Sequence, residues 1–278
     1  MPEYGCIYKE NFLDLGKGIA IMTVGSDARR ENPGKTSPLE IALVVESSSF
    51  ETKAQTTREE LTKIPGIFKV VEIKYLDSDF YNYHREEVIA EPSYRNNNYP
   101  SRVIDAEFIS GDYQTFRLMK VKFDTFLHDG GKEARNLINK EKYRMKYFNN
   151  KLDEAMGEED YFKFDQRDVD TPSYRDDMSL RIKMTALRLM QSYVTFNLMQ
   201  LIREGVIDTI EIPHQTDKRF VFLYTQKRIP TTKDMDEYKY LYKYFLKKYI
   251  QGKKSKFFDP GREPDFRKNL ERLKTLFE

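Results

Sequence analysis

The stretch from residue 19 to residue 46, IAIMTVGSDARRENPGKTSPLEIALVVE, constrains the fold of this chain more than any other. Residues 19–24 and 41–45 are short, mainly apolar runs on either side of a polar segment that begins with Gly25. Apolar runs of this length, bounded by glycine and proline, favour buried β-strands over helices. The stretch therefore predicts a strand, a glycine turn, a short polar helix or loop, and a second strand.

The turn after the first predicted strand carries residue types that suit a phosphate group. Glycine at position 25 lets the backbone turn tightly and approach a ligand closely. Ser26 offers a hydroxyl group, and the N–H groups at the start of a helix form a ready site for an anion. Arg29 and Arg30 follow one helical turn later, and arginine suits bidentate contacts with phosphate. We therefore expect phosphate binding at Gly25, Ser26, Arg29 and Arg30.

This pattern resembles the signature of the nucleotidyltransferase superfamily, in which an apolar strand, a Gly-Gly or Gly-Ser turn and a second strand with two acids follow one another. The closer likeness is to the uridylyltransferase domain of the PII-protein-modifying enzymes, whose turn reads Gly-Gly/Ser-x-x-Arg-x-Glu. Four positions match that turn: Gly25, Ser26, Arg29 and Glu31. A later family block, Asp/Glu-x-Arg-x-x-x-Gly-Asp, resembles residues 105–112, although Glu107 stands in place of the arginine.

The paired acids of the family are only half present. Family members carry Ser-Asp-x-Asp where this chain has Ser37-Pro38-Leu39-Glu40. In that register Pro38 replaces the first acid and Glu40 keeps the second. In the alternative register Glu40 is the first acid and Ala42 replaces the second. One acid of the pair is missing in either register.

The resemblance implies Mg²⁺ as cofactor, because nucleotidyl transfer uses metal ions to clamp the attacking and leaving oxygens. Asp105 and Glu107 stand two residues apart on a later predicted strand, so their side chains would share one face. The implied roles are catalytic for Glu40 and Asp105, and metal binding for Glu40, Asp105 and Glu107. The structural alternatives are an ordinary strand-entry residue at Glu40, and a pairing of Arg29 and Arg30 with Asp27 or Glu31 on a solvated helix.

The activity that the resemblance implies is transfer of a nucleoside monophosphate from an NTP, UTP or ATP, to a protein or small acceptor. Because one acid is missing, two other interpretations stay open. The first is a pseudoenzyme that acts as a nucleotide- or protein-binding module. The second is a scaffold or effector that keeps the fold and has lost the site.

The rest of the sequence predicts an α+β protein of two domains, which its 278 residues can accommodate. Strand patterns at 68–76 and 102–110, and a helix pattern at 113–127, extend a nucleotidyltransferase-like domain at 1–130 with a mixed sheet and helices.

The remainder, residues 131–278, predicts a mostly helical domain, with its longest helical pattern at 178–203. The segments 206–212 and 219–226 read as two short strands, which predicts a small β-hairpin inside this domain.

Composition and charge limit the partners. The net charge of +2 gives no overall basic field that demands nucleic acid. The basic run from Lys247 to Lys256, with Tyr249 inside it, leaves RNA or an acidic partner open. Cys6 is the single cysteine, which excludes an internal disulfide. Without an apolar run of roughly 20 residues or a visible signal peptide, we expect a cytoplasmic protein with no membrane partner, while secretion as an effector stays open.

Overall fold

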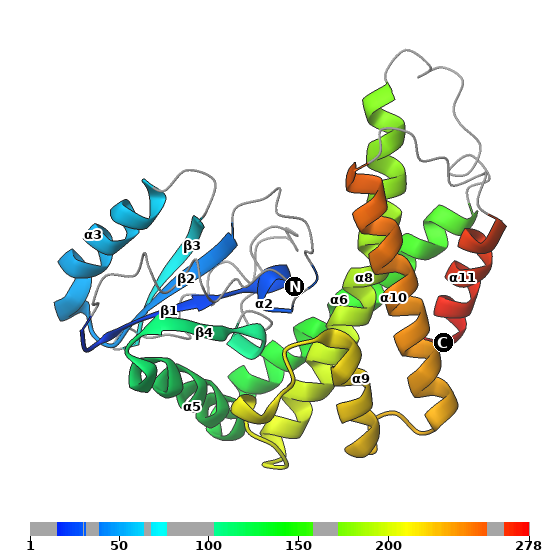
Figure 1. Cartoon of the computed structure of the whole chain (residues 1–278). Coiled ribbons are helices and arrows are strands. Elements are labelled where there is room, and N and C mark those ends of the chain that lie inside the picture. Colours follow the sequence, from blue (N-terminus) through cyan, green and yellow to red (C-terminus); the bar gives the residue numbers. More distant parts are fainter. Residues whose placement is uncertain are drawn as a thin grey trace. The chain divides into compact units, whose positions relative to one another are not determined.

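A computed structural model of the chain describes residues 16–29, 31, 39–63, 68–76, 103–157, 172–254 and 264–277 (Figure 1). These residues form an α+β protein with two compact units. Unit 1 consists of Met1–His128 and Gly205–Gln215, and unit 2 consists of Asp129–Glu204 and Thr216–Glu278. In the part of the chain that is described, no helix has both the length and the apolar character needed to cross a bilayer.

Among the described residues, four strands in the order β3-β2-β1-β4 form a mixed sheet at the centre of unit 1. Its strands are β1 (Ile19–Thr23), β2 (Leu39–Val45), β3 (Phe68–Tyr75) and β4 (Glu107–Gly111). Strand β1 pairs antiparallel with β2 and β4, whereas β2 and β3 are parallel. All residues of β1 are buried. Because both faces of this central strand are buried, its sequence is a nearly continuous apolar run. The strands predicted at 19–24, 41–45 and 68–76 are confirmed.

Helices α2 (Gly25–Ala28), η1 (Ser48–Phe50) and α3 (Glu51–Thr62) lie between the first three strands, and α5 (Tyr113–Asp129) follows β4. The side chain of Ser47 accepts a hydrogen bond from the Ser49 N–H and so caps η1. Helix α3 makes the crossover that two parallel neighbouring strands require. Helix α5 buries Phe116, Met119 and Phe123, which recur at helical spacing and confirm the helix predicted there.

Unit 2 is helical in the residues that the structure describes. Its helices are α6 (Gly131–Gly157), α8 (Pro172–Arg203), α9 (Thr216–Thr225), α10 (Thr232–Lys254) and α11 (Pro264–Thr275). Helix α8 contacts α6, α9 and α10, and Leu189, Met190 and Leu198 of α8 are buried. The long central helix predicted from its wide apolar stripe is therefore confirmed.

One carboxylate is buried inside unit 2. Glu141 of α6 is 2% exposed, and Arg144 Nη1 lies 2.7 Å from its Oε1. Burial raises the pKa of Glu141 above its usual range, while Arg144 and a hydrogen bond with Ser192 act in the opposite direction. The net direction means that burial outweighs the partners, so the charged form of Glu141 is disfavoured in the folded state.

The predicted β-hairpin is wrong. Segment 206–212 ends in a 3₁₀ turn, η4 (Thr209–Glu211), and segment 219–226 lies mostly within helix α9. Their apolar and β-branched residues gave a strand pattern. Phe220 and Leu223, however, are three residues apart and are both buried, which is the spacing of one helix face. Packing of that face against the unit 2 core therefore decided the structure of this segment.

The segment 205–215 returns the chain to unit 1, although the sequence placed it in the second domain. The Thr209 N–H donates to Asp124 Oδ2 of α5 at 3.1 Å, and the Thr209 hydroxyl bonds to the same carboxylate. Burial raises the pKa of Asp124 above its usual range, although the two bonds from Thr209 oppose that shift. Unit 1 is thus built from two stretches that unit 2 helices separate in the sequence.

The strand predicted at 102–110 is shorter than expected. Residues 103–105 form a helical turn, and β4 begins only at Glu107. Glu107 pairs with Thr23, the last residue of β1, so the residues before it have no partner on β1. The chain there turns into a helical conformation because backbone groups of a buried segment must find hydrogen bonds elsewhere.

Candidate functional site

The Gly25 turn and Glu40 lie together, as the sequence predicts for two parts of one site. Gly25 has φ +65°, in the left-handed region that glycine adopts without strain. Glu40 lies on the neighbouring strand β2, and its Oε2 would lie 3.4 Å from a β-carbon placed on Gly25. The Val24 N–H also donates to the Glu40 carbonyl at 3.2 Å. A carboxylate oxygen therefore stands directly against the turn.

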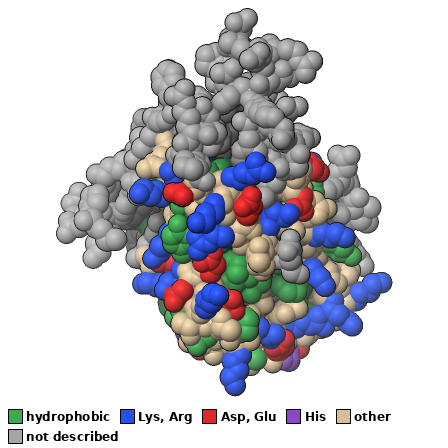
Figure 2. All heavy atoms as spheres, turned by 90° about the vertical axis from the view of Figure 1, so that its right-hand side faces the viewer, with side chains coloured by type: hydrophobic (Ala, Val, Ile, Leu, Met, Phe, Trp, Pro, Cys, Tyr) green, Lys and Arg blue, Asp and Glu red, His purple; other side chains and the backbone are tan. Residues whose placement is uncertain are grey.

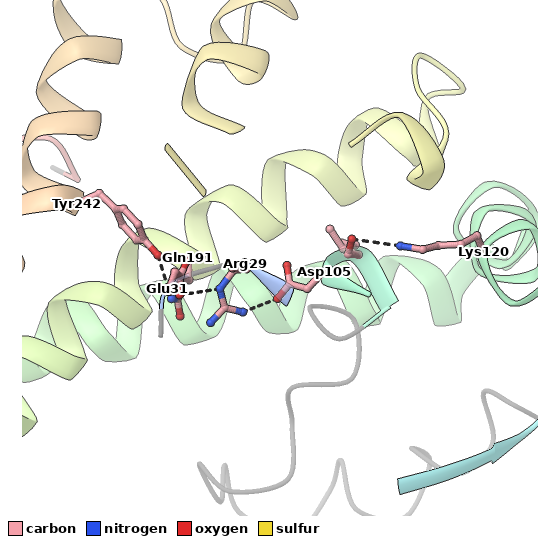
Figure 3. Close-up of polar contacts among 7 residues, drawn as sticks. Arg29, Glu31, Asp105, Lys120, Gln191 and Tyr242 are labelled. Atoms are coloured by element: carbon pink, nitrogen blue, oxygen red, sulfur yellow. Dashed lines mark hydrogen bonds and ion pairs between the residues drawn. The ribbon is translucent and has the colours of Figure 1, made fainter. Parts of the chain in front are cut away.

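Arg29 is held between two acids (Figure 3). Its Nε lies 2.9 Å from Glu31 Oε2, and its Nη1 donates to Asp105 Oδ2. The side chains of Arg29, Glu31 and Asp105 are 12%, 6% and 2% exposed. One guanidinium therefore serves two carboxylates in a nearly dry environment, where such bonds are strong. The contact with Glu31 is the pairing that the sequence left open as an alternative for Arg29, but the pair is nearly buried, and Asp105 was not predicted as a partner.

Asp105 and Glu107 do not share a strand face, and that prediction is wrong. Asp105 belongs to the helical turn before β4, and Glu107 is the first residue of β4. Thr23 of β1 pairs with Ile41 of β2 on one side and with Glu107 of β4 on the other. Directly paired side chains lie on the same face of a sheet, so Ile41, Thr23 and Glu107 share one face. Glu40 immediately precedes Ile41 and therefore belongs to the opposite face. The structure brings Glu40 to the turn and leaves Glu107 on the other side.

The residues at the turn can be compared with what Mg²⁺ requires. The ion is bound through one or two carboxylates together with substrate phosphates and waters. Glu40 places one carboxylate oxygen at the turn, and the Asp105 carboxylate accepts a bond from Arg29. Among the described residues, no three His, Cys, Asp or Glu side chains are grouped in a way that could hold a metal ion. Magnesium at Glu40 stays a prediction.

Two predicted nucleotide-binding residues lie partly or wholly outside the described part of the chain. Ser26 belongs to α2, but its side chain is not described, and Arg30 is not described at all. Helix α2 is a single turn of four residues. So few aligned peptide units build little of the dipole that attracts anions to the start of a longer helix.

The sequence did not single out Lys120, which positions the Asp105 turn. Lys120 is 3% exposed, and its Nζ donates to the carbonyls of Val103 and Ile104. Figure 3 draws one of these two bonds. A signal for this role exists, because Lys120 is four residues from Phe116 on the buried face of α5, where a charged residue is rare. Lysine in an otherwise apolar stripe indicates a buried acceptor nearby.

Asp112, which belongs to the second block of the resemblance, joins β1 to α5. Its Oδ2 accepts a 2.9 Å hydrogen bond from the Gly18 N–H, and its Oδ1 accepts one from the Gln114 N–H at 2.9 Å. The bond from Gly18 is the main cause that lowers the pKa of Asp112 below its usual range. This carboxylate therefore holds the start of β1 beside the start of α5.

Comparison of the chain with models of known protein families, with curated proteins and with solved structures found no match in any of the three.

Proposed function

We propose that this chain is a catalytically degenerate, nucleotidyltransferase-like protein that binds a nucleoside triphosphate with Mg²⁺ at the Gly25 turn. The observation that carries the proposal is the Glu40 carboxylate, which stands 3.4 Å from the β-carbon position of Gly25. Strand, glycine turn and acid-bearing second strand are the parts that the resemblance assigns to a nucleotide site.

The position of Glu40 makes a cation necessary for this proposal. A triphosphate that approaches the turn meets a carboxylate, and like charges repel each other. A divalent cation between them reverses the sign of that interaction, and phosphates together with one carboxylate form a usual magnesium environment. Nucleotide binding at this turn should therefore depend on Mg²⁺.

The contacts of Arg29 favour binding over transfer. A two-metal transfer reaction needs several acids that converge on one place. Here Asp105 is paired with Arg29, and Glu107 lies on the face of the sheet opposite Glu40. Transfer of a nucleoside monophosphate to a protein or small acceptor is the second candidate, because Glu40 also fits the second acid of the family pattern.

The test is thermal unfolding of the full chain with each NTP, in Mg²⁺ and in EDTA. A ligand at 100 times its dissociation constant stabilises a folded protein by about 2.7 kcal/mol. We expect a rise in Tm only when NTP and Mg²⁺ are both present. Glu40→Gln, which keeps the size of the side chain, should remove that rise. Glu46→Gln is the matched control, because Glu46 is exposed just after the same strand.

The outcomes separate the interpretations. An unchanged Tm with every NTP contradicts the nucleotide site and favours a scaffold or protein-binding role. A rise in EDTA, or one that Glu40→Gln keeps, contradicts the role of Glu40. A mass increase of one nucleoside monophosphate, on the chain or on an added acceptor, shows transfer and contradicts degeneracy.

A further inference from the structure

Helices α10 and α11 of unit 2 carry a surface on which tyrosine rings and cations alternate. The Arg272 guanidinium carbon lies 4.8 Å from the ring centroid of Tyr240, and Lys248 Nζ lies 5.6 Å from that of Tyr244. The two rings are 6.4 Å apart between centroids, with their planes 24° apart. The order is cation, ring, ring, cation, and we name these four residues the aromatic-basic ladder.

The helices order this ladder before any ligand arrives. Tyr240, Tyr244 and Lys248 recur every four residues on α10 and so share one face. On α11, Arg272 is fixed by hydrogen bonds to Asn269 and Glu237. Side chains that are already immobilised lose less entropy on binding, which favours recognition by this surface.

Tyr240 of the ladder is accessible, and exposed lysines lie near the ladder in the sequence. Tyr240 is 47% exposed, which is high for a large aromatic side chain. Two exposed lysines are close to the ladder in the sequence: Lys247 directly precedes Lys248 on α10, and Lys268 stands four residues before Arg272 on α11. The acids that pair with Lys243 and Lys239, namely Asp217 and Asp236, lie on α9 and on the preceding turn of α10.

The charged residues in the second half of α10 are all positive. From residue 239 to residue 254 the sequence holds lysines and no acidic residue: Lys239, Lys243, Lys247, Lys248, Lys253 and Lys254. Figure 2, which views the side where α11 lies in Figure 1, shows Lys and Arg side chains across this face, with Asp and Glu side chains and hydrophobic side chains between them. The lysines of this half of α10 and the rings beside them suit an anionic ligand that also carries apolar, flat groups.

We propose that the aromatic-basic ladder, with Lys247 and Lys268, binds single-stranded nucleic acid. Exposed lysines contact phosphates, and an exposed aromatic ring such as that of Tyr240 stacks with unpaired bases without a preference for sequence. An acidic peptide would pair with the cations but would leave the rings unused. A duplex hides the flat faces of its bases, so it would gain only the electrostatic part. The proposed surface lies in unit 2 and does not depend on the nucleotide site of unit 1.

The phosphate contacts can be tested by fluorescence anisotropy of a labelled 20-nucleotide oligo(dT) with the full chain at several salt concentrations. Each phosphate contact with a single strand adds about 0.7 to the slope of log affinity against log salt. The double variant Lys247→Gln/Lys268→Gln should therefore lower that slope by roughly 1.4. Lys142→Gln/Lys146→Gln, which removes the same charge from exposed positions on α6, should keep the slope.

The ring contact is tested by Tyr240→Leu and Tyr240→Phe in the same assay. Loss of one stacked ring should weaken binding at least about fivefold, whereas phenylalanine keeps the ring and the affinity. Far-UV circular dichroism verifies that each variant is folded. Equal affinity of Tyr240→Leu and the unchanged chain would overturn the proposal. Equal binding of a duplex of the same length, or equal competition by polyglutamate, would also overturn it.

Discussion

Replacement of Arg29 by methionine should destabilise unit 1 far more than removal of an exposed arginine does. Arg29 is 12% exposed and pairs with Glu31 and Asp105, which are 6% and 2% exposed. Methionine fills a similar volume and leaves two carboxylates in a nearly dry place without their cation. Removal of one partner from a buried ion pair costs about 3–5 kcal/mol. The matched control is Arg228→Met, because its pair with Glu204 is 27% and 48% exposed and such exposed pairs contribute about 0–1 kcal/mol.

The free energy of unfolding can be measured by urea titration with far-UV circular dichroism, since the chain has no tryptophan for fluorescence. Two units can unfold separately, so hydrogen exchange of peptides from β1 and β2 is needed to assign the loss to unit 1. The double variant Arg29→Met/Asp105→Asn should recover part of the lost free energy of unfolding, because it no longer buries an unpaired Asp105 carboxylate. Equal costs for Arg29→Met and Arg228→Met would refute the structural role and make Arg29 a candidate for ligand binding again.

Three further predictions concern the turn and two carboxylates. Gly25→Ala and Gly131→Ala should each lower the free energy of unfolding, measured by urea titration, by about 1–2 kcal/mol because both glycines have positive φ. Only Gly25→Ala should also weaken the NTP-dependent rise in Tm, since its β-carbon meets Glu40. Glu141→Gln should raise Tm at neutral pH, and this rise should disappear below the ordinary pKa of glutamate. The reason is that the pKa of Glu141 is raised in the folded state, so the contribution of Glu141 to the free energy of unfolding falls as pH rises. A rise in Tm that does not change with pH would contradict this. Asp112→Asn should lower Tm at neutral pH, and the loss should fade in acid, because the pKa of Asp112 is lowered and its stabilisation is lost as pH falls; a loss that persists in acid would contradict the charge as its cause.

Local patterns were sufficient for the elements whose burial is set by their own sequence. The apolar runs of β1 and β2 and the helical spacing of Phe116 and Phe123 on α5 each predicted the correct element. The helical turn at 103–105 was missed because its cause lies in another segment, at the residue where β1 ends. Helix α9 was missed for a similar reason, since contact with the rest of unit 2 selects the helix.

The candidate site was predictable only where it follows from neighbouring strands. Placement of Glu40 beside Gly25 follows from an antiparallel pair joined by one connection. The contact between Arg29 and Asp105 joins positions 76 residues apart, and no periodicity in either segment indicates it. The opposite faces of Glu40 and Glu107 depend on the pairing register of three strands, which single-sequence patterns do not specify.

The return of residues 205–215 to unit 1 has a consequence for synthesis on the ribosome. Asp124 and its hydrogen-bond partner Thr209 are 85 positions apart, and helices α6 and α8 are translated between them. The amino-terminal part of the nascent chain therefore cannot form this contact until helices α6 and α8 have been synthesised. A gene fragment that stops near codon 130 would encode a protein with an unmatched carboxylate on its surface. A gene designed to express unit 1 alone should join its two coding segments through a short linker.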